Sequence, residues 1–110
     1  MSYMSGSVGI RCRRAVLWTL WDNYSASAGD YVEQSVNLGF SKYTLYLKVD
    51  GACNVKIELS PDDGAHYYEA QTVSFSGAGD KIIVIDVIFN KIKLTVDSAV
   101  TITAQLVGIV

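Results

Sequence analysis

The sequence contains little of what builds a catalytic or metal centre. Its 110 residues include two cysteines and one histidine. Cys12 and Cys53 match no zinc or redox spacing; they could form at most one disulfide, which the sequence leaves open. His66 has no second histidine or cysteine beside it to complete a metal site. Asp62 and Asp63 lack the alternating acidic ligands of a calcium loop, so we expect them to cap a turn. We therefore expect no enzyme activity, no metal and no cofactor.

Charged residues are scarce as well, at 18% of the chain, against roughly 25% in an average soluble protein. The net charge of −2 argues against a coat on nucleic acid, because neutralising phosphates takes many Lys and Arg side chains. Only Arg11, Arg13 and Arg14 cluster, and we expect them on a solvated or salt-bridged arm. No secretory signal is recognisable, and no segment reaches the roughly 20 apolar residues that span a membrane.

Alternating apolar and polar residues predict β-strands. In 43–50 and again in 53–60, every second side chain is apolar, which is typical of a strand with one side on a core. Residues 50–52 connect these two strands, and 60–64, which include the single proline, form the clearest turn. Cys53 falls on the apolar face, which predicts a buried free thiol.

Further runs predict strands at 16–21, 31–38, 66–75, 81–89, 92–96 and 100–110. The run 81–89 is apolar on both faces, so we expect it to be the central strand of a sheet. No segment shows the apolar spacing of an amphipathic helix. We predict an all-β fold, an antiparallel β-sandwich (jelly-roll-like or Ig-like) of about eight strands. Residues 1–14 are expected to form an N-terminal arm, and 15–110 a single domain.

Half of the residues are hydrophobic, and they include seven Tyr and two Trp. This is more apolar surface than one small core can hold, which predicts that subunit contacts cover part of it. Trp18 and Trp21, near Tyr24 and Tyr31, are expected in the core and at an interface; an exposed row of rings that stacks on sugars is the alternative. The predicted interface residues are Arg11, Arg13, Arg14, Trp18, Trp21, Tyr46, Val107, Ile109 and Val110.

About two thirds of the chain, from Tyr43 to Val110, resembles small β-sandwich structural proteins of tailed phages and related viruses. The similarity rests on the segments YTLYLKVDGACNVKIELSPDDG (43–64), IKLTV (92–96) and VTITAQLVG (100–108). Strands joined by a short Gly turn, a strand ending in Ser-x-Asp-Gly and a closing strand pair recur in such proteins. The resemblance implies a capsid decoration protein, a minor capsid protein or a tail component.

The leading hypothesis is a non-enzymatic structural subunit of a viral particle. Such a subunit would be made in the host cytoplasm, reside in the virion, and bind itself as a homo-oligomer as well as other virion proteins, with no membrane or nucleic-acid partner. One alternative is a carbohydrate-binding β-sandwich module, whose partner would be a glycan. Another is a subunit of an extracellular filament that is completed by strand addition from a neighbour.

Overall fold

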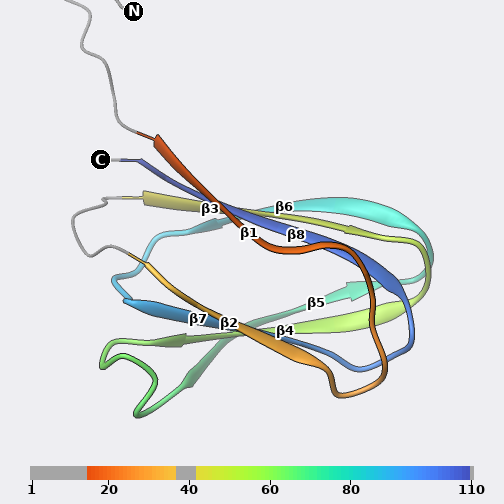
Figure 1. The fold of residues 1–110 in the computed structure, drawn as a ribbon, viewed down its shortest axis with the longest axis horizontal. Coiled ribbons are helices and arrows are strands. Elements are labelled where there is room, and N and C mark those ends of the chain that lie inside the picture. Colours follow the sequence, from red (N-terminus) through yellow and green to blue (C-terminus); the bar gives the residue numbers. More distant parts are fainter. Residues whose placement is uncertain (1–14, 37–41, 110) are drawn as a thin grey trace, which may run out of the picture.

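The computed structural model describes residues 15–36 and 42–109. Eight strands make up the fold: β1 (Ala15–Ser25), β2 (Tyr31–Ser35), β3 (Lys42–Val49), β4 (Cys53–Ser60), β5 (Tyr68–Phe75), β6 (Gly79–Ile85), β7 (Lys91–Val96) and β8 (Thr101–Ile109). They form two four-stranded antiparallel sheets, in the orders β1-β8-β3-β6 and β2-β7-β4-β5, which lie as two layers in Figure 1. The predicted all-β sandwich is confirmed. The arm predicted at 1–14 lies outside the described residues.

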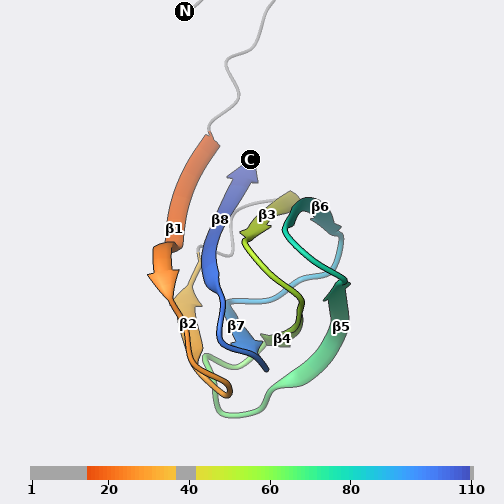
Figure 2. The same ribbon diagram turned by 90° about the vertical axis from the view of Figure 1, so that its right-hand side faces the viewer.

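The connections between strands identify the type of sandwich. Each step along the chain changes sheet, except the step from β4 to β5, and β8 lies between β1 and β3 (Figure 2). This arrangement is a jelly roll. In an Ig-like sandwich, by contrast, consecutive strands such as the first two pair within one sheet. The strand order therefore selects the first of the two sandwich types that the sequence left open.

The core lies between the central strands of the two sheets. In β8 every second side chain is buried, and β3, β4 and β7 show the same alternation. The apolar side chains without solvent exposure are Leu45, Val55, Ile92, Leu94, Val96, Ile102, Ala104 and Leu106. Cys53 is a buried free thiol, as predicted, and burial raises its pKa.

The expectation of a central strand at 81–89 is wrong. The strand β6 spans Gly79–Ile85 and lies at the edge of its sheet, where it pairs with β3 alone, and a loop follows it. Ile82 and Val84 point to the outer surface and are exposed, whereas Ile85 is buried. A sequence run that is apolar on both faces is typical of a buried central strand. It also occurs in an edge strand whose outer face carries exposed apolar side chains, as in β6.

Candidate functional site

The outer face of the β1-β8-β3-β6 sheet changes in character along its strands. The register aligns its outward side chains in rows across the four strands. The first row consists of Leu17, Val107, Thr44 and Val84, and the second of Thr19, Gln105, Tyr46 and Ile82. In the third row, Thr103, Lys48 and Asp80 are neighbours. The face is thus mostly apolar near the end of β8 and polar near its start.

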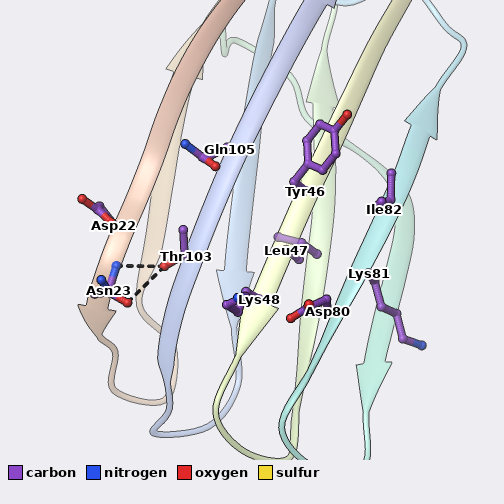
Figure 3. A pocket seen from close by; sticks show the side chains of 10 residues that line it. All are labelled: Asp22, Asn23, Tyr46, Leu47, Lys48, Asp80, Lys81, Ile82, Thr103 and Gln105. Carbon is purple, nitrogen blue, oxygen red and sulfur yellow. Dashed lines mark hydrogen bonds between the residues drawn. The ribbon is translucent and has the colours of Figure 1, made fainter.

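A shallow groove of about 430 Å³ lies over the polar half of this face (Figure 3). Its lining residues come from four strands and are Asp22, Asn23, Tyr46, Leu47, Lys48, Asp80, Lys81, Ile82, Thr103 and Gln105. A second hollow shares Asn23, Lys48, Asp80 and Thr103 with it, and extends it toward Asp50 at the end of the sandwich. The two together form one elongated depression along the sheet.

A bulge in β1 brings Asn23 to the groove. The pairing of β1 with β8 shifts between Thr19 and Trp21 and again between Trp21 and Tyr24. Asn23 adopts a φ of 50°, a left-handed conformation in which asparagine is several-fold enriched. Its N–H donates to Thr103 Oγ1 at 3.0 Å, which ties the bulge to the neighbouring strand. The amide side chain of Asn23 is thereby held beside the groove (Figure 3).

The groove combines one exposed ring with polar side chains. Tyr46 supplies the ring, and the amide of Gln105 donates to Thr19 Oγ1 at 3.3 Å. Lys48 and Asp80 add one charge of each sign on neighbouring strands. Amide, hydroxyl, ammonium and carboxylate groups together offer both donors and acceptors. A face of this kind can bind a polyhydroxy ligand beside the ring, or the polar rim of another protein.

The outer face of the other sheet is occupied by contacts among its own side chains. Lys93 Nζ lies 4.5 Å from the centre of the Tyr31 ring and 5.5 Å from that of Tyr67. The Tyr67 hydroxyl donates to Glu33 Oε2 at 2.9 Å. Burial, and then this hydrogen bond, raises the pKa of Tyr67. Since Lys93 also stands opposite both Glu33 and Glu58 in the register, charges on this face are largely balanced locally.

The turn predicted at 60–64 is built around Ser60 and Asp62. The buried Ser60 hydroxyl accepts the N–H of Gly64 at 2.8 Å and donates to Asp62 Oδ1 at 2.8 Å. Asp62 Oδ1 also accepts the N–H of His66 at 2.9 Å, and Asp62 Oδ2 lies 2.6 Å from His66 Nδ1. The hydrogen bond with His66, followed by the one from Ser60, lowers the pKa of Asp62 to about 2. Asp62 therefore caps the turn as predicted, and His66 belongs to this turn, before β5 begins.

The predicted interface residues that the structure describes lie partly on one outer face and partly against the core. Arg11, Arg13, Arg14 and Val110 lie outside the described residues. Tyr46 is exposed in the groove, and Val107 and Ile109 lie half-buried on the same outer face. Trp18 is half-buried against the core, with its ring 6.2 Å from that of Tyr43. Trp21 is only 7% exposed and stacks on Tyr24, so it offers little surface to a partner or to a sugar. Whether these residues form an interface stays a prediction.

A group of exposed apolar side chains that the sequence analysis did not single out lies around the edge strand β6. The described residues include nine exposed large hydrophobic side chains, and five of them, with exposures between 59% and 88%, belong to this group. We name them the β6-edge cluster: Tyr68, Ile82, Val84, Val87 and Ile88. Tyr68, Val87 and Ile88 line one hollow, and Val84 and Val87 line the next, which opens between β5 and β6. The signal in the sequence was the run 82–88, which was interpreted as buried.

Residues 15–36 and 42–109 contain no group of three His, Cys, Asp or Glu side chains that could hold a metal ion. The same residues contain no helix that is long and apolar enough to cross a membrane.

The fold and the site together define a jelly-roll β-sandwich with an open groove on one outer face and an apolar edge. No family model and no curated protein sequence matches the chain. Among solved structures, it is similar to the SPBc2 prophage-derived protein YomS, at a TM-score of 0.58 and 15% identity, over 94% of this chain and 99% of that one.

Two further solved structures are similar to this chain. A family 29 carbohydrate-binding module matches at a TM-score of 0.53 and 18% identity, over 87% of this chain and 86% of that one. A chain of infectious bursal disease virus, Gx strain, matches at a TM-score of 0.55 and 12% identity, over 89% of this chain and 32% of that one. At such identities the likeness shows the fold alone.

Proposed function

We propose that this chain is a non-enzymatic structural subunit of a virus particle, which associates with copies of itself and with other virion proteins. The observation that carries the proposal is the β6-edge cluster, in which five large apolar side chains are exposed along one side of a small sandwich. Scattered apolar residues are normal on a surface, but a contiguous group marks a surface that another molecule covers. A capsid decoration protein, a minor capsid protein and a tail component would each have such a covered surface.

The structural neighbours support the viral setting. YomS is a prophage-derived protein and matches this chain over nearly the full length of both. In the infectious bursal disease virus chain, the part with a similar fold makes up about a third of the length. The matched YomS chain is similar in length to this one, and the virus chain is about three times as long, so the fold occurs in chains of both sizes.

Self-association is the direct test of this function. Size-exclusion chromatography with light scattering on the full chain, at micromolar concentration and above, is expected to give a mass of two chains or more. Apolar burial drives such association, so moderate salt should not reverse it. A mass of one chain throughout would contradict a self-assembling subunit.

A carbohydrate-binding module is the second candidate, favoured by the groove on the β1-β8-β3-β6 sheet. The groove places the exposed Tyr46 ring among amide and hydroxyl groups, which is the chemistry that binds sugar rings. Similar structures include family 29 modules complexed with cellulohexaose and with mannohexaose. A virion protein could also carry such a site, so the two candidates are not exclusive.

Retention on immobilised β-linked glucan or mannan tests the second candidate. Tyr46→Ala should weaken binding about tenfold, since a ring contact of about 1.4 kcal/mol corresponds to that factor. Tyr31→Ala is the matched control, because Tyr31 is exposed on the opposite outer face (58% against 42%) and should leave retention unchanged. No retention of the unaltered chain, or an equal loss in both variants, would contradict a sugar site in this groove.

A further inference from the structure

The sandwich has four edge strands, and they differ in how well they are protected from pairing with a strand of another molecule. The pairing of β1 with β8 is interrupted twice, and that of β5 with β4 is shifted between Ile57 and Glu58. Bulges of this kind bend and twist an edge away from a new partner. The third edge strand, β2, has five residues, and short edge strands are a second form of protection.

The fourth edge strand, β6, lacks both of these protections. It pairs with β3 through seven consecutive residue pairs, from Tyr43 opposite Ile85 to Val49 opposite Gly79, without a shift. Its other side faces no strand in the described part of the chain. A regular edge strand with apolar side chains presents a row of backbone donors and acceptors on which another strand can pair.

We propose that β6 pairs in antiparallel fashion with β6 of a second copy, so that two four-stranded sheets become one eight-stranded sheet across a two-fold axis. This proposal rests on the function proposed above and names the partner and the contact surface. Ile82 and Val84 of both copies would then lie side by side on the outer face. The exposed Val87 and Ile88 at the end of each strand would approach the start of the other.

A second copy fits this edge because an antiparallel pair of identical strands is self-complementary. Each strand supplies the donors and acceptors that the other lacks. The exposed Ile82 and Val84 of each copy would also cover those of the other.

The two charged residues of β6, Asp80 and Lys81, both have partners within the chain. A charged side chain that points inward from an edge strand commonly discourages pairing. Lys81 Nζ, however, lies 5.5 Å from the centre of the Phe75 ring on β5, so its ammonium is engaged with the open side of the sandwich. Asp80, at the outward position near the start of the strand, lies opposite Lys48 on β3. The outward positions that follow it, Ile82 and Val84, carry no charge.

The test places a lysine on the outer face of β6 and, as a matched control, on the opposite edge of the same sheet. Ile82→Lys puts like charges near the two-fold axis, at a side chain that is 67% exposed and so adds little to folding. Leu17→Lys makes the same change on β1, at 57% exposure. Light scattering on the full chain should show that the Ile82→Lys mass is half that of the unaltered chain, while Leu17→Lys keeps the full mass.

Cysteine cross-linking provides an independent test that does not depend on dissociation. In a Cys12→Ser background, Ile82→Cys and Val84→Cys chains, separately or mixed, should form a disulfide-linked dimer on mild oxidation, since paired strands bring such positions within about 4.4 to 6.8 Å. A Leu17→Cys chain should not cross-link.

The outcomes separate the pairing from the wider function. A larger mass that Ile82→Lys leaves unchanged, or that Leu17→Lys lowers equally, overturns the β6 pairing and leaves self-assembly standing. So does a failure of the two β6 cysteine chains to cross-link in an associated sample. A mass of one chain for the unaltered protein overturns both.

Discussion

At the scale of single residues, the sequence predicts the position of the turn between β4 and β5, but not all of the hydrogen bonds that hold it. Pro61 and Gly64 identified the turn, and Gly64 adopts a φ of +92°, in the region that favours glycine. A Cβ at Gly64 would also lie 3.2 Å from Lys91 Cδ. The role of Ser60 was not recognisable from the sequence. Its hydroxyl is a buried acceptor for two backbone N–H groups, and this depends on how the turn folds over it.

Asp62 should titrate well below an ordinary aspartate. Its pKa in the folded chain is about 2, against a reference value of 3.8, because His66 and Ser60 hydrogen-bond to the ionised carboxylate. A lowered folded-state pKa means that the stabilisation is fully present above pH 3.8 and is lost as the pH falls through about 2. An NMR titration of the side-chain carboxyl carbon is expected to place its midpoint near 2. A midpoint at the reference value would contradict the hydrogen-bonded turn.

At the scale of elements, the two-residue periodicity predicted the strands of the core but not their neighbours. The runs 43–50, 53–60 and 92–96 became β3, β4 and β7 almost residue for residue. Periodicity describes which side chains share a face, and it carries no information on which strand lies beside which. The strand at 81–89 was therefore assigned to the middle of a sheet, although its counterpart β6 lies at an edge.

The bulge in β1 is a second feature that periodicity misses. Leu20 and Trp21 are consecutive, and both are buried, because the register shifts between Thr19 and Trp21. An extra residue in a strand reverses the alternation beyond it. For this reason Trp18 and Trp21 do not form the exposed aromatic row that their spacing allowed as an alternative, and the exposed ring of the groove is Tyr46.

Two neighbouring positions on β8 should differ sharply in their effect on stability. Leu106 has no solvent exposure, whereas Gln105 lies on the outer face. Leu106→Ala is expected to lower the free energy of unfolding by about 2 to 5 kcal/mol, through lost burial and the cavity left behind. Gln105→Ala should change it by less than about 0.5 kcal/mol. Urea denaturation followed by circular dichroism measures both, and similar losses would contradict the assigned faces of β8.

At the scale of the whole molecule, composition indicated excess apolar surface, and the structure localises much of it. The predicted excess matches the β6-edge cluster and the apolar rows beside it. The choice between a jelly roll and an Ig-like sandwich could not be made from the sequence, because it depends on pairings between strands far apart in the chain, such as β1 with β8. Composition suggested a surface for partners, but it could not say which side of the sandwich provides it.

Association should also appear in thermal unfolding. A partner that binds only the folded chain stabilises it by mass action, so the Tm is expected to rise by several degrees over about a hundredfold increase in protein concentration. Ile82→Lys should remove this dependence. Differential scanning fluorimetry over a dilution series measures both. A Tm that is independent of concentration for the unaltered chain would contradict an associated native state.

The position of β8 constrains when the protein can fold. This strand is the last of the eight to be synthesised, yet it fills the gap between β1 and β3 and pairs with both. Until it emerges from the ribosome, the sheet that carries the groove is split into β1 and a β3–β6 pair that share no hydrogen bonds. Completion of the sandwich must therefore wait until β8 has been synthesised, and before that point a nascent chain exposes β6 without the finished fold that presents it.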